Sequence, residues 1–254
     1  MTENDATMRR GGPGGFLIAI AIALAGWFIG TGLTNIRTSD RFVTVKGVSE
    51  RPVKADLATW PIMLAVTDDN VSIAQTRINQ NIAKVTSFLI ANGIDSSEVE
   101  LQSLKVTDVL AAVYNPSTRA GNRFIIQQTV MVRSEDPEKV RAASQKVGEL
   151  VNAGVVLSSG PEWGPGGPSY FFRRLNDLKP SMIAEATAEA RKAAEQFAKD
   201  SKSRLGGIHS ANQGVFVILP RDAAGADQGG MGGEQSQIQK TVRVVTTVEY
   251  LLRN

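Results

Sequence analysis

The chain of 254 residues contains no cysteine and a single histidine, His209. The absence of cysteine excludes disulfide bonds, thiolate zinc sites, iron–sulfur clusters and a cysteine nucleophile. One histidine cannot build a multi-histidine metal site within one subunit, and it leaves one imidazole as a candidate general base. The sequence also lacks any block of five like charges, and its net charge is only +3. We therefore expect no nucleic-acid partner.

The composition that remains is typical of a folded protein. Hydrophobic residues make up 42% of the chain and charged residues 21%, which favours a globular chain over a disordered one. The length allows one large domain or two small ones.

The most informative segment lies near the N-terminus. Residues 1–15 are polar and glycine-rich, and residues 16–36 (FLIAIAIALAGWFIGTGLTNI) carry no charge. About 20 apolar or small residues are enough to cross a bilayer as a helix whose backbone hydrogen bonds are internal. We predict a flexible cytoplasmic leader at 1–15 and a transmembrane signal anchor at 16–36. Within the anchor, Gly26-x-x-x-Gly30 offers small residues for helix association.

Two alternatives to the anchor remain open. The segment can act as a signal peptide cleaved after Ala25, because Ala23-Leu24-Ala25 has the required small-residue pattern, and the product would then be secreted to the periplasm. It can also be a buried core helix, although it lacks a polar face.

The flanking charges give little preference for one orientation of the anchor. Arg9 and Arg10 precede the segment, whereas Arg37, Arg41 and Lys46 follow it, so the positive charges are almost balanced. The short leader is more easily read as cytoplasmic. We therefore predict a single-pass protein of the inner (cytoplasmic) membrane with its main domain in the periplasm or outside the cell.

From residue 41 onward, strand and helix patterns alternate. Period-two alternation predicts strands at 41–48 and 53–67, with Pro61 indicating an edge strand or a bulge. Apolar spacings of three and four predict a helix that opens at Asp68-Asp69-Asn70 and closes at Asn92-Gly93. Further predictions are a hairpin at 98–113 and 122–134, a helix at 136–152, a strand from 155, a helix at 178–204 stopped by Gly206-Gly207, and strands at 208–219 and 237–252.

This order of elements predicts an α+β fold with antiparallel or mixed sheets and helices packed on them. The segments 53–134 and 155–252 share a strand–helix–hairpin order. We therefore expect one domain over 41–252 built from two pseudo-repeated lobes, roughly 41–134 and 135–252.

No group of residues in the sequence has the spacing of a catalytic or metal site. His209 lacks a neighbouring nucleophile and orienting partner, and there is no G-x-S-x-G or S-x-x-K motif. The glycine clusters at 11–15, 164–168 and 229–233 do not match phosphate-binding loops. Asp68-Asp69 lacks EF-hand spacing and is explained by helix capping. We expect no catalytic residue, metal or cofactor, and hence no enzyme.

One cluster combines basic and aromatic side chains. Arg173-Arg174 follows Tyr170, Phe171 and Phe172. Such a cluster can touch a nucleic acid or an anionic lipid surface, but two arginines are too few to carry that affinity. A strand end or a contact between subunits is the favoured interpretation.

Several stretches together resemble the SIMPL-domain family, the bacterial envelope proteins that include the periplasmic immunogenic protein. They are VTVKGVSERPVKADLA, the IANGID helix exit, RFIIQQTVMV, VGELVNAGV, AEATAEARKAAEQFAKDSKSRLGGI and VRVVTTVEYLL. The resemblance covers about Arg41 to Leu252 and rests mostly on apolar positions and glycines. It implies an α+β domain, an exported location and assembly into large hollow or ring-like oligomers, and it implies no catalytic residues. Members of the family often have a cleaved signal peptide, from which the long segment here departs.

The leading hypothesis is therefore a non-enzymatic, membrane-anchored envelope protein that forms a large homo-oligomer and contacts the membrane through residues 16–36. Family association adds a link to envelope or oxidative stress. Edge strands near Pro61 and the chain end, and the loop at 221–236, are the expected contact regions. The alternatives are a periplasmic binding module for a lipid or small apolar ligand, in a pocket between helix and sheet, and a histidine-independent hydrolase.

Overall fold

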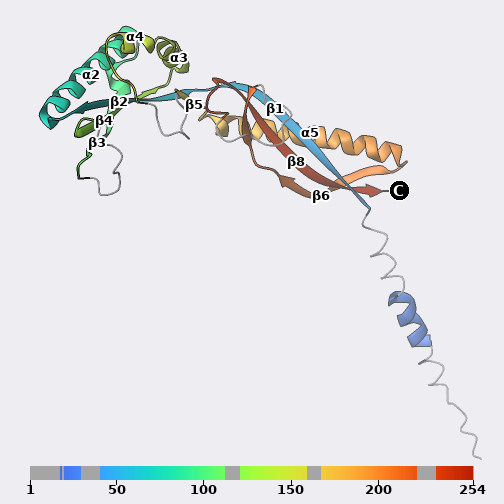
Figure 1. Cartoon of the computed structure of the whole chain (residues 1–254). Helices are drawn as coiled ribbons and strands as arrows, with labels where there is room; N and C mark the ends of the chain where they lie inside the picture. The colour runs from blue at the N-terminus through green and yellow to red at the C-terminus, as the bar shows by residue number, and fades with distance from the viewer. Residues whose placement is uncertain are drawn as a thin grey trace, which may run out of the picture. The chain divides into compact units, whose positions relative to one another are not determined.

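The fold is α+β, as the sequence predicts. The computed structural model describes residues 18, 20–29, 41–111, 121–158, 167–221 and 233–253. Within these residues the strands form two four-stranded sheets, one ordered β1-β8-β6 with β7 also pairing β8, the other ordered β3-β4-β2-β5 (Figure 1). Helices pack on both sheets, and their apolar contacts form the cores described below.

The N-terminal segment is described only in part. Residues 18 and 20–29 are helical, and their side chains are exposed. The leader at 1–15, the rest of the expected anchor and Gly30 of the glycine pair lie outside the described residues. Among the described residues, no helix is both long and apolar enough to span a membrane. The anchor at 16–36 therefore stays a prediction.

The rest of the chain divides into two compact units, each made of separate segments. The first unit contains residues 1–47, 187–212 and 246–254, and the second contains residues 48–186 and 213–245. The strands β1 and β8 and the helix α5 contribute residues to both. The pseudo-repeated lobes at 41–134 and 135–252 stay a prediction.

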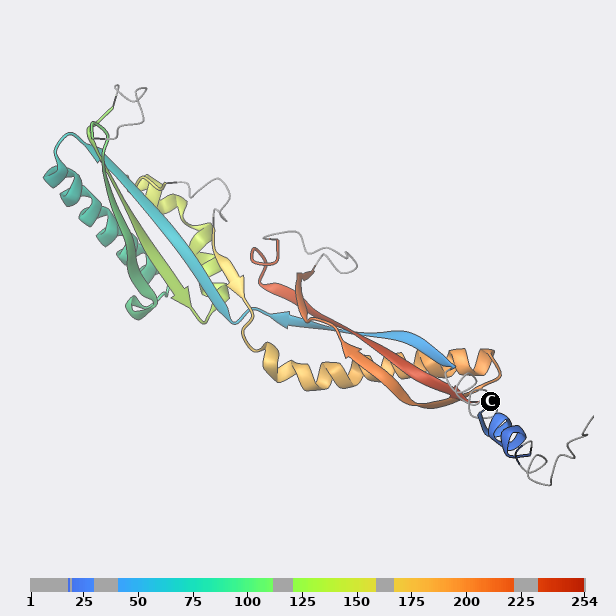
Figure 2. The same ribbon diagram turned by 90° about the horizontal axis from the view of Figure 1, so that it is seen from below.

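The sheet β3-β4-β2-β5 lies within the second unit, and its neighbouring strands pair antiparallel. β2 (Leu57–Asp68) pairs with β4 (Phe124–Ser134) along its length, and β5 (Ser169–Phe171) pairs with the first residues of β2. β3 (Val99–Asp108) pairs with β4, which confirms the predicted hairpin. Figure 2 shows the helices of residues 71–91 and 137–152 packed against this sheet.

Alternating apolar residues explain how this sheet buries one face. Trp60, Ile62 and Leu64 of β2 point to the same face and are almost fully buried. They meet α2 (Val71–Ala91), whose apolar residues Ile78, Val85 and Leu89 recur at helical spacing and have no exposed surface. The predicted alternation and the predicted helix are both confirmed.

The ends of α2 also follow the sequence. The side chain of Asn70 accepts hydrogen bonds from the backbone N–H groups of Ser72 and Ile73, at 2.9 and 3.4 Å. Gly93, just after the C-cap Asn92, has φ +82°, a conformation that glycine adopts without steric cost.

Pro61 does not lie in an outer strand, because β2 is between β4 and β5 in the strand order. β5, however, pairs only with residues 57–59 of β2, whereas Pro61 is opposite Met131 of β4. Within the described residues, the other side of β2 at Pro61 has no strand partner. A proline without an N–H donor is tolerated at such a position. The prediction of an edge strand was therefore wrong, because β2 is an inner strand. At Pro61 itself, however, β2 is paired on one side, as in an edge strand.

Two predicted elements after β4 differ from the structure. The helix expected at 136–152 is divided into α3 (Pro137–Gln145) and α4 (Gly148–Asn152), with Asp136 capping α3. The strand expected from 155 is reduced to a single bridge between Leu157 and Leu64. Here the apolar run 155–157 supplies buried residues such as Val155 to the core rather than a strand to the sheet.

The other sheet contains β1 (Phe42–Lys54), β6 (Arg204–Gln213), β7 (Val217–Pro220) and β8 (Gln239–Arg253), and α5 (Leu175–Asp200) packs on it. In the first unit, Ala190 and Ala194 of α5 contact a cluster that includes Val248 and Tyr250. In the second unit, Met182 and Ala186 pack with Val242 and Val244. Small alanine side chains let the helix approach the strands closely.

The end of α5 differs from its prediction. The helix ends at Asp200, and Lys202 takes the left-handed conformation with φ +54°. Gly206 and Gly207, predicted to stop the helix, lie inside β6. A Cβ on Gly206 would be 2.9 Å from the carbonyl oxygen of Leu251, so the glycine is needed for close approach to β8 rather than for a helix end.

Lys240 in β8 is buried, with an exposed fraction of 2%. Its ammonium donates a hydrogen bond to the backbone carbonyl of Glu234, and burial lowers its pKa. We expect Lys240→Met to raise the free energy of unfolding at pH 7 by about 1 kcal/mol, because a buried charge is replaced by an apolar side chain.

The pH dependence provides the check on Lys240. The unfolded chain keeps the lysine proton to higher pH than the folded chain, so the native protein should gain stability as pH rises from the lowered folded pKa toward the unfolded value near 10.4. The variant should lack this gain. Denaturant unfolding of both proteins at pH 7 and pH 10 measures the difference, and a variant less stable than the native protein at pH 7 would contradict the prediction.

Candidate functional site

His209 lies on an exposed part of β6 rather than in a pocket. Its ring stacks on Phe42, with ring centroids 6.0 Å apart and an angle of 16° between the planes. This position favours the interpretation of His209 as a surface histidine of the sheet. The histidine-independent hydrolase stays a prediction.

Asp68 and Asp69 have structural roles at the start of α2. The carboxylate of Asp68 accepts a hydrogen bond from the backbone N–H of Asn70 at 2.9 Å and forms an ion pair with Arg77 at 2.9 Å. Asp69 accepts a hydrogen bond from the backbone N–H of Arg123 at 2.9 Å, which fixes the start of the β4 segment. Across the described ranges, no three His, Asp or Glu residues are placed to hold a metal ion.

Most of the glycine clusters are not described. Of the clusters at 11–15, 164–168 and 229–233, the structure describes only Gly167, Pro168 and Gly233, so their interpretation as loops stays a prediction.

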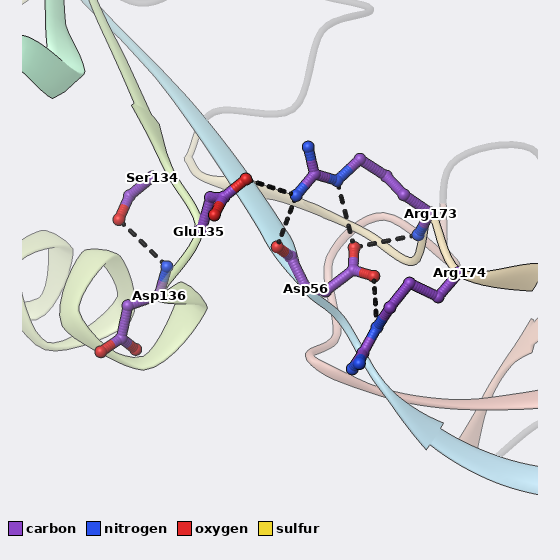
Figure 3. Close-up of polar contacts among 6 residues, drawn as sticks. All are labelled: Asp56, Ser134, Glu135, Asp136, Arg173 and Arg174. Atoms are coloured by element: carbon purple, nitrogen blue, oxygen red, sulfur yellow. Dashed lines mark hydrogen bonds and ion pairs between the residues drawn. The ribbon is translucent and has the colours of Figure 1, made fainter.

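The arginine pair singled out by the sequence forms an ion-pair cluster with Asp56 and Glu135 (Figure 3). Asp56 lies between β1 and β2, and its side chain is 14% exposed. Its carboxylate accepts hydrogen bonds from the backbone N–H and the Nε of Arg173, at 2.9 and 3.4 Å, and from the Nε of Arg174 at 3.3 Å. Arg173 also donates to Glu135 through Nη2 at 2.9 Å.

These contacts decide how the basic cluster is best interpreted. The hydrogen bond to Glu135, together with Asp56, raises the pKa of Arg173, so this guanidinium stays charged between two carboxylates, while Arg174 contacts Asp56. A positive pair already neutralised by the fold is poorly suited to bind a nucleic acid or an anionic lipid surface. The cluster instead holds together the link between β1 and β2, the start of α3 and the segment before α5.

Sequence reasoning found the arginines but missed their acidic partners. Asp56 and Arg173 are 117 positions apart, and no local motif joins them. Only the pairing of β5 with β2, which places Leu57 opposite Phe171, brings the two segments together.

The outer strand β6 presents the most exposed surface of the sheets. From Gly207 to Gln213 every residue is exposed, including Ile208 with 54% of its surface accessible. Only Arg204 and His209 can carry a charge in this strand. An outer strand of ten residues with so little charge is a template for pairing with another strand.

β1, β3 and β5, which are also outer strands, carry features that disfavour such pairing. β1 contains Pro52 and several charged residues, and β5 has only three residues. β3 contains Leu101, which is 54% exposed, but its register shifts between Gln102 and Lys105, and Ser103 between them has φ +54°. Irregular backbone, proline and charge are the usual protections of a sheet edge.

A shallow groove of about 540 Å³ lies between α2 and α4. Its walls include Phe88 and Leu150, together with small residues such as Ala83 and Ala153. The groove differs from the expected pocket between helix and sheet because it is formed by two helices. The ligand-binding alternative stays a prediction.

Comparison with known families identifies the family of this chain. The SIMPL family, described as a protein of unknown function (DUF541), matches residues 43–250. Among curated proteins, none matches the chain significantly.

Proposed function

Because this chain belongs to the SIMPL family, we propose that it is a non-enzymatic, membrane-anchored protein of the cell envelope that assembles into a large homo-oligomer. The anchor is residues 16–36, and the domain lies in the periplasm or outside the cell. The uncharged length of that segment supports the anchor. A link to envelope or oxidative stress rests on family association alone.

The exposed edge of β6 carries the proposal. Its backbone groups can continue the hydrogen-bond ladder of the sheet into a second copy, and Ile208 can bury apolar surface in the same contact. The same contact can form between each copy and the next. If the rotations between neighbouring copies add up to a full turn, the assembly is a closed ring or cage.

Substituting Ile208 with lysine should break this contact. The lysine adds a charge to the pairing edge, so we expect the full-length protein, extracted in mild detergent, to shift from a large particle to monomers or small oligomers. Mass photometry of native and Ile208→Lys protein measures the particle mass.

Leu101→Lys provides a matched control. Leu101 lies in the outer strand β3 and has the same 54% exposure as Ile208, but its strand is irregular. The control should keep the native particle mass. A native protein that is already monomeric, or a Leu101 variant that dissociates while the Ile208 variant does not, would contradict the proposed assembly surface.

The mass of the purified chain tests the anchor separately. An intact mass of the full sequence, 27.2 kDa, is expected for a retained anchor. A chain that begins at Gly26 would support cleavage after Ala25 and a free periplasmic protein.

A further inference from the structure

A polar cavity of about 650 Å³ lies in the second unit. α3, β5, the residue after β7 and the segment leading into β8 contribute its walls. The side chains that line it include Glu138, Arg141, Tyr170, Arg221, Gln237 and Gln239. The volume is within the range of small-molecule sites.

Positive side chains outnumber negative ones around this cavity. Glu138 lies between two cations: its carboxylate is 2.8 Å from Arg141 and 3.2 Å from Lys54. The hydrogen bond with Lys54, reinforced by Arg141, lowers the pKa of Glu138, so the carboxylate stays ionised. One carboxylate shared by two cations leaves a net positive charge around Glu138, which lines the cavity.

A second arginine lines the same cavity from another segment. Arg221 directly follows β7 and lines the cavity. Among the described residues, no ion pair involves Arg221. Within the described part of the chain, its guanidinium charge is therefore not neutralised by an ion pair.

The remaining walls are suited to hold a small polar molecule. Tyr170 is buried, with 5% of its surface exposed, and burial raises the pKa of its hydroxyl, which therefore stays neutral. Its position is fixed by the pairing of β5 with β2 and by a hydrogen bond from its backbone N–H to the carbonyl of Gln235 at 2.8 Å. The ring gives a rigid apolar wall, and Gln237 and Gln239 supply amide groups nearby.

We propose that this cavity binds a small organic anion, whose carboxylate or phosphate group lies between the guanidinium groups of Arg141 and Arg221. Planar guanidinium groups match both kinds of anion through paired hydrogen bonds. The proposed binding site does not depend on the proposed assembly surface. An experiment can therefore contradict one of the two proposals without contradicting the other.

Titration of the full-length protein with two probes tests the site. Inorganic phosphate and succinate are added separately at constant ionic strength, and binding is followed by calorimetry. We expect saturable binding of at least one probe with a dissociation constant of about 1 mM or tighter. The probe that binds more tightly distinguishes a phosphate-bearing ligand from a carboxylate.

Arg221→Gln is the decisive variant because its side chain pairs with nothing in the described fold. It should keep the melting temperature of the protein without ligand and weaken probe binding about tenfold, the loss expected for a charge-assisted hydrogen bond. Arg141→Gln should also weaken binding.

Arg191→Gln is the matched control, since it removes one positive charge from α5, where Arg191 pairs with Glu195 at 3.3 Å outside the cavity. It should bind both probes like the native protein. The proposal is overturned if neither probe binds saturably, if Arg221→Gln binds as tightly as the native protein, or if Arg191→Gln weakens binding equally.

Discussion

Replacing Leu64 with alanine is expected to lower the free energy of unfolding by about 2–5 kcal/mol. Leu64 has no exposed surface and lies in the middle of β2, opposite Gln128 of β4 and bridged to Leu157. Its side chain belongs to the large core between the sheet and α2. The alanine leaves a cavity that surrounding strands cannot close, because they are held in register on both sides.

Denaturant unfolding of the detergent-solubilised full chain, followed by circular dichroism, measures this loss. Leu101→Ala is the control, because the same side chain is removed from a position that is 54% exposed. The control should change stability by no more than about 0.5 kcal/mol. Equal losses in the two variants would show that Leu64 is not the buried position described.

Gly214→Ala is expected to destabilise the protein by about 1–3 kcal/mol. A Cβ at this position would be only 2.6 Å from the carbonyl oxygen of Val245. The same oxygen accepts a hydrogen bond from the backbone N–H of Gly214 at 2.9 Å, so the close approach cannot relax without breaking that bond. Thermal unfolding monitored by circular dichroism detects the change as a lower melting temperature.

Gly207→Ala is the matched control, and it should change the stability of the protein in the opposite direction. Gly207 lies in β6, has no positive φ, and a Cβ there would have no atom within 4 Å. Alanine restricts the unfolded chain, so a gain of about 0.4–1 kcal/mol is expected. If both alanine variants change stability in the same direction, close contact with Val245 is not what requires glycine at 214.

Local signals predicted the elements that are stabilised locally. Asn70 and Gly93 identify the ends of α2 from sequence because a cap and a left-handed turn depend on adjacent residues. The alternation of β2 and β4 likewise predicted the antiparallel sheet, since a buried face requires period two. The helix–hairpin order and the α+β class follow from these patterns.

The predictions failed where distant segments decide the structure. Gly206 and Gly207 follow a helix pattern and were predicted to stop it, but Gly206 serves the contact with Leu251 in another strand. Arg173 lies just after the end of β5, in line with the favoured interpretation of a strand end, but its acidic partners Asp56 and Glu135 were not predicted. Neither partner can be identified until strand pairing is known.

The strand order also sets the sequence of events in folding. β1 neighbours β8 in its sheet, and Thr44 of β1 donates a hydrogen bond to Glu249 of β8 across 205 positions of the chain. The strands β2 to β5, in contrast, find all their partners between residues 57 and 171. That sheet can therefore form while the chain is still being made, whereas β1 must wait, unpaired, for the last strand. The long loop closure makes the pairing of β1 with β8 the slow step of folding, and the waiting strand is the segment that most needs protection from aggregation.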